Sequence, residues 1–188
     1  AGDLDIHNKA NLGALTSVGG GLRIFADASL GALTSVGGDL YIRADAELAA
    51  LTSVAGDLNI HAKASLDALT RVGGSLYIRA DADLGALTRV GGSQLPDAET
   101  AEKNMRIIAP LALAEGALDM KNWHTCTTTH CMAGWAQYAI LGKQDSETAS
   151  VDGTRLLGLD AARKFHVSND EAKKYLQQFI SHEKEDLK

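Results

Sequence analysis

The sequence has few cysteines, prolines and aromatic residues, and it has no long hydrophobic run. Of its 188 residues, 2 are cysteine, 2 are proline and 5% are aromatic. No run of about 18 apolar residues occurs, so we expect no segment that spans a membrane. A secreted repeat protein often carries several disulfides, and Cys126 and Cys131 both lie outside the repeats described below. We therefore expect a reducing, cytoplasmic setting.

Neither half of the chain has an excess of basic residues. The whole chain carries 18 lysines and arginines and 24 aspartates and glutamates, a net charge of −6. The first 95 residues carry 7 of the basic and 10 of the acidic side chains, and the remainder carries the other 11 and 14. Each part therefore has a net charge of −3. Nucleic-acid binding depends on basic patches that neutralise phosphates, so we expect no nucleic-acid partner.

An 18-residue repeat, present five times without insertion, dominates the first half of the sequence. Its apolar positions hold the same residue type in every copy. They are leucine at 4, 22, 40, 58 and 76, isoleucine at 6, 24, 42, 60 and 78, leucine at 12, 30, 48, 66 and 84 and at 15, 33, 51, 69 and 87, and valine at 18, 36, 54, 72 and 90. Such a fixed step is typical of a solenoid, because one unit cannot bury its apolar side alone. The sequence predicts a β-solenoid domain of five coils over residues 1–95.

Each copy contains a short stretch with the alternation of a strand. In Leu40-Tyr41-Ile42-Arg43 the leucine and isoleucine are expected to point inward, and the tyrosine and arginine outward. The two outward columns are Asp5, Arg23, Tyr41, Asn59 and Tyr77, and His7, Phe25, Arg43, His61 and Arg79. Tyrosine and arginine are enriched at protein interfaces. We therefore predict that Tyr41, Arg43, Tyr77 and Arg79 bind another protein; the alternative is a solvated face whose side chains stack on each other.

Threonine occupies one position in every coil, at residues 16, 34, 52, 70 and 88. A regular threonine row is a feature of ice-binding faces, but the neighbouring column contains Arg71 and Arg89, which interrupt a flat, uncharged surface. The simpler interpretation is that the hydroxyls bond to the backbone in turns.

The first coil, at Gly2 to Ile6, has no capping sequence of its own. Open strand edges invite association with other chains. We expect this edge to pair with another chain, for example in a homodimer, or to be covered by an upstream segment.

The repeat unit L-x-x-L-x-x-V-x-G-x-L-x-I resembles the repeats of receptor L domains, which are right-handed β-helices related to leucine-rich repeats. It also resembles repeat arrays in uncharacterised bacterial and phage proteins. The resemblance covers residues 1 to about 92, and it implies a right-handed β-helix but no function. L-domain repeats usually carry an asparagine ladder after the strand. Here only Asn8 starts that column and alanines replace it in the later copies, so no such ladder is expected.

Residues 96–188 lack the repeat and predict a small all-α domain that caps the solenoid. Terminal caps shield the apolar end of a repeat array. The predicted helices are one that Asp97 caps and that ends at 107 or 108 before Pro110, one over about Thr129–Leu141 that Gly142 ends, one over Thr154–Phe165, and one to Ile180 that a Ser168/Glu171 capping box opens.

The stretch W-H-x-C-x-x-x-H-C-x-A-G-W, from Trp123 to Trp135, is the densest cluster of reactive side chains. With Val167-Ser-Asn-Asp-Glu-Ala it resembles a tail segment of uncharacterised bacterial and phage proteins. That resemblance implies a phage or mobile-element origin, with a host protein as the target. It implies no role for the residues.

Three interpretations of this stretch follow from its residues. In the first, Cys131 is the nucleophile of a transferase or hydrolase, with its thiol pKa lowered at a helix N-terminus and His124 or His130 as the base. The solenoid would then recognise the substrate. In the second, His124, Cys126 and Cys131 bind zinc, with His130 as a further candidate that cannot easily share one ion with its neighbour Cys131.

In the third and favoured interpretation, Cys131, Trp123 and Trp135 pack in the core of the helical domain, and no cofactor is needed. Buried free cysteines are common in protein cores. The sequence therefore predicts an interaction scaffold, with a cysteine-dependent enzyme as the alternative.

Overall fold

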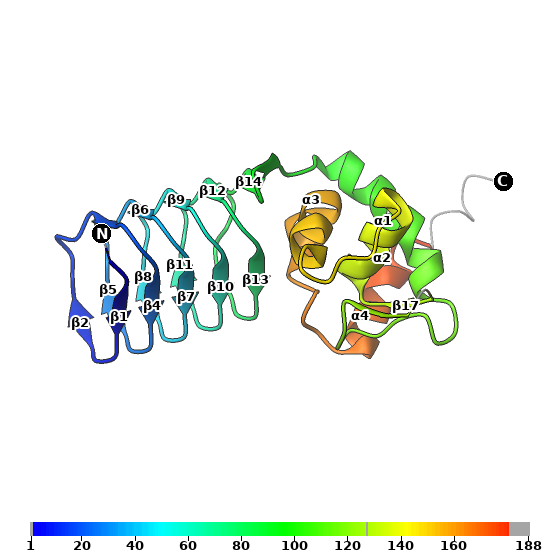
Figure 1. The fold of residues 1–188 in the computed structure, drawn as a ribbon, viewed down its shortest axis with the longest axis horizontal. Coiled ribbons are helices and arrows are strands. Elements are labelled where there is room, and N and C mark those ends of the chain that lie inside the picture. Colours follow the sequence, from blue (N-terminus) through cyan, green and yellow to red (C-terminus); the bar gives the residue numbers. More distant parts are fainter. Residues whose placement is uncertain (1, 127, 181–188) are drawn as a thin grey trace. The chain divides into compact units, whose positions relative to one another are not determined.

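A computed structural model describes residues 2–126 and 128–180, without the side chains of Thr125 and Cys126. The chain divides into two compact units, with the boundary between Gln94 and Leu95 (Figure 1). In the described residues, unit 1 is a β-solenoid and unit 2 is a helical domain. The predicted fold class is confirmed.

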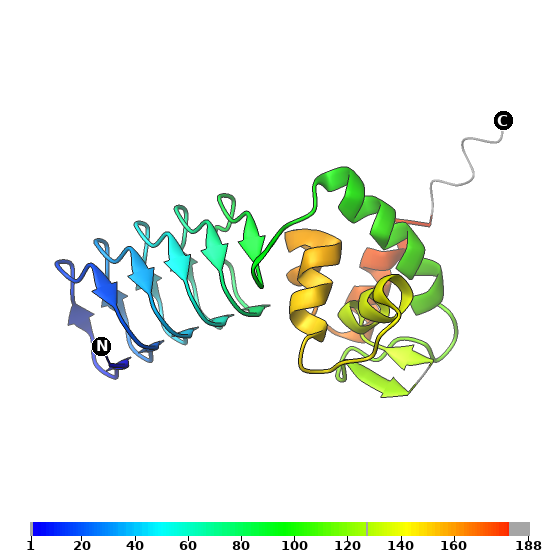
Figure 2. The same cartoon turned by 45° about the horizontal axis from the view of Figure 1, so that its top comes forward.

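Short strands of successive coils stack into parallel sheets that run along unit 1 (Figures 1 and 2). One sheet consists of β1 (Leu4–Ile6), β4 (Leu22–Ile24), β7 (Leu40–Ile42), β10 (Leu58–Ile60) and β13 (Leu76–Ile78). The second consists of β2 (Ala10–Asn11), β5 (Ala28–Ser29), β8 (Ala46–Glu47) and β11 (Ala64–Ser65). The third consists of β3 (Ser17–Val18), β6 (Ser35–Val36), β9 (Ser53–Val54), β12 (Arg71–Val72) and β14 (Arg89–Val90), and the antiparallel β15 (Ser93–Gln94) ends it.

The register between neighbouring coils follows the sequence repeat. Leu22 pairs with Leu40, and Leu40 pairs with Leu58, so each strand partner lies 18 residues away. Identical apolar residues therefore stack on one another inside the solenoid. Leu40 and Ile42 are both 0% exposed, which confirms that these columns point inward. The first coil is the least covered, since Leu4 is only half-buried.

The threonine row bonds each coil to the one before it. Thr34 Oγ1 donates a hydrogen bond to the carbonyl oxygen of Thr16 at 2.9 Å, and the pattern repeats as far as Thr88. The interpretation that these hydroxyls bond to the backbone is confirmed. Because the hydroxyls of the last four threonines bond to the preceding coil, the row is part of the connection between coils.

A row of aspartates makes a second connection that the sequence analysis did not identify. Asp39 Oδ1 accepts the backbone N–H of Asp57 at 2.8 Å, and Asp57 Oδ1 accepts that of Ser75 at 2.7 Å. Asp3 Oδ1 accepts the N–H of Gly21 in the same way, at 2.7 Å. The sequence feature that could have predicted this row is the aspartate at 3, 39 and 57, the same position of the 18-residue repeat.

The glycines at 20, 38, 56 and 74, each two residues before a strand of the first sheet, are required by the close stacking of the corners. A Cβ atom on Gly38 would lie 2.8 Å from the backbone nitrogen of Gly21 in the preceding coil. Real Cβ atoms do not approach backbone atoms so closely, and this neighbour is backbone that cannot rotate away. Only a residue without a side chain fits this corner at the observed distance between coils.

In the described residues, unit 2 contains helices and one small hairpin. The helices are α1 (Ala98–Ala112), α2 (Met132–Leu141), α3 (Ala149–Ala162) and α4 (Asn169–Gln177). The hairpin pairs β16 (His124–Cys126) with β17 (Thr129–His130) in antiparallel fashion. The predicted helix start at about Thr129 is therefore wrong, because Thr129 and His130 are in a strand and α2 begins after Cys131.

Two further helix boundaries differ from the predicted ones. Helix α1 continues through Pro110, since a proline in the last turn removes only one hydrogen-bond donor and the N–H of Leu113 still donates to Ala109 O at 3.0 Å. Helix α3 starts at Ala149 and kinks at Gly158, whose φ is 80°. The Ser168/Glu171 capping box of α4 is present as predicted. Among the described helices, none is long and apolar enough to cross a membrane.

The buried leucine column gives a direct test of the coil geometry. Replacing Leu40 with aspartate would place an unpaired charge where the exposed fraction is 0%, so we expect Leu40→Asp to lower the free energy of unfolding by at least about 3 kcal/mol. Urea unfolding of unit 1, followed by circular dichroism, measures this change. The matched control is Ala49→Asp at an exposed position of the same coil, which should change stability by less than about 0.5 kcal/mol. Equal stability of the two variants would contradict the inward assignment.

Candidate functional site

The sheet β1-β4-β7-β10-β13 presents two rows of side chains outside the solenoid, and we call this surface the strand face. Strands β4, β7, β10 and β13 bury the first and third residues and leave the middle one at least partly exposed. Tyr41 and Tyr77 are half-buried in the middle row, and Arg43 and Arg79 are exposed in the row that follows it. The structure therefore brings the four predicted binding residues together on one sheet.

In the part of the strand face formed by the first two coils, the side chains mainly contact one another. The rings of His7 and Phe25 stack with centroids 4.8 Å apart and planes 3° from parallel. Arg23 lies 3.3 Å from the carboxylate of Asp5. In this part the side chains stack and pair as the alternative interpretation expected, although Phe25 remains 39% exposed.

The part formed by the last three coils carries positive charge without carboxylate partners. The guanidinium of Arg43 lies over the Phe25 ring, 5.8 Å from its centroid. Among the described residues, no ion pair includes Arg43 or Arg79. His61 stands between them in the row, and its pKa is lowered, first by partial burial and then by repulsion from Arg79 and Arg43. Burial is the larger cause, and the two arginines add a positive field at this position.

A shallow groove of about 690 Å³ follows the second sheet of unit 1. Its floor includes alanines 10, 28 and 46, and its rims carry both signs of charge. Ser29 Oγ donates a hydrogen bond to Glu47 Oε2 at 2.6 Å across neighbouring coils. The sequence analysis did not select this groove, because alanine at a repeat position looks the same whether it forms a floor or a core.

In unit 2, Cys131 is the N-cap residue of α2, and its Sγ accepts the backbone N–H of Gly134 at 3.3 Å. The expected position at a helix N-terminus is therefore correct. The side chain is only 1% exposed, however. Burial outweighs the stabilisation by the helix N–H groups and raises the pKa of the Cys131 thiol to about 12. The thiol is protonated at neutral pH in this environment.

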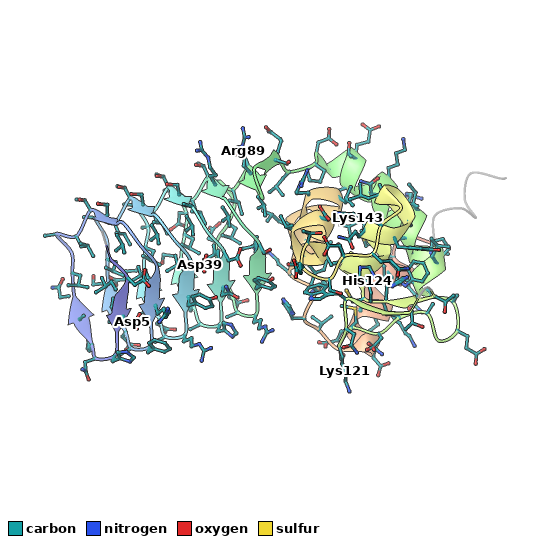
Figure 3. The ribbon with its side chains drawn as sticks, viewed as in Figure 1. Asp5, Asp39, Arg89, Lys121, His124 and Lys143 are labelled. Carbon is teal, nitrogen blue, oxygen red and sulfur yellow. The ribbon has the colours of Figure 1, made fainter. Side chains whose placement is uncertain are left out.

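The two histidines of the motif face each other across the hairpin. His124 Nδ1 lies 3.0 Å from His130 Nδ1, and His124 Nε2 lies 2.8 Å from Gln137 Oε1. His130 and Gln137 are fully buried, while His124 is half-buried. The hairpin and helix α2 therefore share one polar network, which lies near the labelled His124 in Figure 3.

The partners of Gln137 determine where the protons lie in this network. Gln137 Oε1 accepts the N–H of Asp145 at 2.7 Å, and Gln137 Nε2 donates to Asp152 Oδ2 at 2.8 Å. The amide oxygen must then accept from His124, so His124 Nε2 carries a hydrogen. With both imidazoles neutral, His124 Nδ1 is an acceptor and His130 Nδ1 donates to it.

At the far end of the network, Asp152 is a buried carboxylate with several donors. Burial alone would raise its pKa, but hydrogen bonds from Lys143, Gln137 and Thr148 outweigh burial and hold the pKa below its usual value. Lys143 Nζ lies 2.7 Å from Asp152 Oδ2. The ion pair therefore stabilises the charged form that orients Gln137, and through Gln137 the histidines.

This geometry favours neither the cysteine nucleophile nor the zinc site among the three interpretations of the motif. Both ring nitrogens of His124 already have hydrogen-bond partners, which leaves neither available to a metal without rearrangement. The Cys126 side chain, a proposed zinc ligand, lies outside the described residues. Within the described part, no group of three or more His, Cys, Asp or Glu side chains is arranged to hold a metal ion.

The packing around the motif supports the third interpretation. Trp135 is buried, and its indole N–H donates to Ala117 O at 2.8 Å. Trp123 meets Phe165 edge to face, with centroids 6.4 Å apart. The network links the hairpin to α2 through Gln137 and to α3 through Asp152. The arrangement is that of a core that holds several elements together.

No protein-family model, curated protein or solved structure that we compared with the chain matches it.

The state of Cys131 can be tested by its reactivity. Because burial raises the thiol pKa to about 12, we expect iodoacetamide to label Cys131 at pH 7.5 at least about a hundredfold more slowly in the folded protein than in urea. Peptide mass spectrometry distinguishes this label from any on Cys126. Labelling of native Cys131 as fast as a free thiol would instead support a nucleophile.

The role of Asp152 can be tested by the pH dependence of stability. Its folded pKa lies below the unfolded value, so the carboxylate stabilises the fold above about pH 4 and this contribution is lost as the pH falls through the folded pKa. Asp152→Asn should lower the free energy of unfolding of unit 2 by about 1–3 kcal/mol at pH 7. The deficit should shrink towards pH 3 in urea titrations. Asp160→Asn, exposed on the same helix, is the control, and a deficit independent of pH would contradict the assignment.

Proposed function

We propose that this protein is a protein–protein interaction scaffold that binds its partner through the strand face. The observation that carries the proposal is the arrangement of the last three coils. Arg43 and Arg79 lack carboxylate partners among the described residues, and the half-buried Tyr41 and Tyr77 lie beside them. Buried aromatic anchors and arginines carry much of the energy of protein interfaces.

The rigidity of the solenoid supports this function. Backbone, threonine and aspartate hydrogen bonds connect successive coils of unit 1. The Phe25 ring is held between the stacked His7 ring and the Arg43 guanidinium. A surface that is already ordered loses little conformational entropy on binding, so more of its contact energy contributes to affinity.

We favour a scaffold over a cysteine-dependent enzyme because the candidate nucleophile is buried and protonated. A thiol with a pKa of about 12 contains very little of the thiolate that attacks substrates. The proposed setting is cytoplasmic, on the basis of the low cysteine content. The resemblance of the Trp123–Trp135 motif implies a phage or mobile-element product, and on that basis we expect the target to be a host protein. Pairing through the first-coil edge remains a second predicted mode of association.

The proposal can be tested by comparing two double variants against one partner. A partner captured with the intact protein and identified by mass spectrometry would be purified and titrated by calorimetry. We expect Tyr41→Ala/Tyr77→Ala to weaken its binding at least about tenfold, since each lost anchor is worth about 1 kcal/mol or more. Both tyrosines are partly exposed, so circular dichroism should show an intact solenoid.

The control is Arg71→Ala/Arg89→Ala, which truncates two exposed side chains on the third sheet of the same unit. Figure 3 shows Arg89 on a different side of the solenoid from Asp5 of the strand face. The control should bind the partner like the parent. Equal losses in the two variants, or no loss in either, would contradict the strand face as the binding surface.

A further inference from the structure

The positive residues on the last three coils form a straight row with regular spacing. Arg43, His61 and Arg79 directly follow β7, β10 and β13, which pair in parallel with no change of register. Neighbouring strands lie about 4.8 Å apart, so the bases of the two arginine side chains are roughly 10 Å apart along the solenoid. The row runs across the strands, parallel to the stacking direction.

The adjacent row on these coils, Tyr41, Asn59 and Tyr77, is uncharged. In the first two coils the corresponding residues are Asp5 and Arg23, which neutralise each other. The strand face is therefore cationic over its last three coils and neutral over its first two. The row of tyrosine and asparagine side chains provides polar contacts and aromatic surface beside the charge.

We propose that these three coils bind an acidic, extended segment of a partner protein, which runs along the row and sets carboxylates against Arg43 and Arg79. The inference rests on the proposed function and names the chemistry of the partner. Arginine pairs bidentately with a carboxylate through its planar fork, so each arginine selects a carboxylate by geometry as well as by charge.

The spacing fits one conformation of such a segment. A polyproline II chain rises about 3.1 Å per residue and turns once every three residues, so side chains three apart recur on one side about every 9.3 Å. This repeat is close to the roughly 10 Å between the two arginine positions. Acidic residues three apart would therefore meet Arg43 and Arg79 in turn.

The charge around the row favours an acidic peptide over a nucleic acid. Unit 1 is acidic overall, and Asp45 and Asp81 lie only two residues beyond Arg43 and Arg79 in the sequence. Duplex DNA carries a charge about every 1.7 Å and is bound by several basic residues at once. Two arginines among acidic neighbours match a ligand with a few carboxylates at defined positions.

The test uses the intact protein and a synthetic peptide of repeated Asp-Pro-Pro triplets, in which proline favours the polyproline II conformation. Binding is measured by calorimetry and by NMR titration of the His61 imidazole in dilute salt, because screening weakens surface pairs. We expect measurable binding of this probe and a rise in the His61 pKa on binding, since the bound carboxylates offset the repulsion from Arg79 and Arg43. A peptide of Asn-Pro-Pro triplets should not bind.

Two charge-matched variants make the test specific. Arg43→Gln/Arg79→Gln should weaken binding of the Asp-Pro-Pro peptide about fivefold, because it removes both of the exposed charge pairs that the bound peptide makes. Arg71→Gln/Arg89→Gln removes the same charge from the third sheet and should bind the peptide like the parent. Both variants alter exposed side chains, so melting curves should match the parent.

The inference would be overturned by equal binding of the two variants, by no binding of the probe to the parent, or by no change in the His61 titration. Tighter binding of an oligothymidylate of equal charge would also overturn it, in favour of nucleic acid. Failure of this inference can be distinguished from failure of the proposed function. If the native partner still depends on Tyr41 and Tyr77 while the acidic peptide does not bind, the interface stands and only its chemistry is wrong.

Discussion

The backbone hydrogen bonds that connect residues 18 apart are the constraint on which unit 1 depends. Thr52 N donates to Thr34 O, and Leu40 N donates to Asp57 O, so each coil is bonded to the coil before and the coil after it. Because the step never changes, each side chain stacks on its equivalent in the next coil. The leucine columns become a continuous core, and the polar columns become ladders such as that of Asp39 and Asp57.

The same stacking determines what the strand face can do. Side chains at the same outward position of each repeat form a row along the sheet. A residue that differs in one copy therefore changes only the part of the row that this copy forms. Arg23 meets Asp5 in the first two coils, whereas no acidic residue occupies the same rows in the last three. An acidic domain thereby carries a local positive surface with aromatic neighbours. This combination of rigidity and local charge is the basis on which we propose the strand face as a binding surface.

In unit 2, burial decides the character of the side chains that look reactive. Cys131 caps α2, and that position alone would lower its pKa, but the loss of solvent raises the pKa to about 12. His124 is hydrogen-bonded to His130 and to Gln137, and Gln137 is hydrogen-bonded in turn to Asp152. A cluster that resembles a reactive centre in the sequence is therefore arranged as the polar part of a core.

Much of this structure was predictable because unit 1 repeats a local pattern. The period, the inward columns and the outward position of Tyr41 and Arg43 all follow from the alternation of residues, since a strand's side chains alternate in any context. The capping box at Ser168 is equally local. The helix through Pro110 and the hairpin at His130 were not predictable, because they depend on contacts between distant segments. The burial of Cys131 was the favoured one of three interpretations, but the sequence alone could not decide among them. The role of Gln137, which orients both histidines, could not be predicted from the sequence. An amide can both donate and accept hydrogen bonds, so its partners are determined only by the tertiary packing.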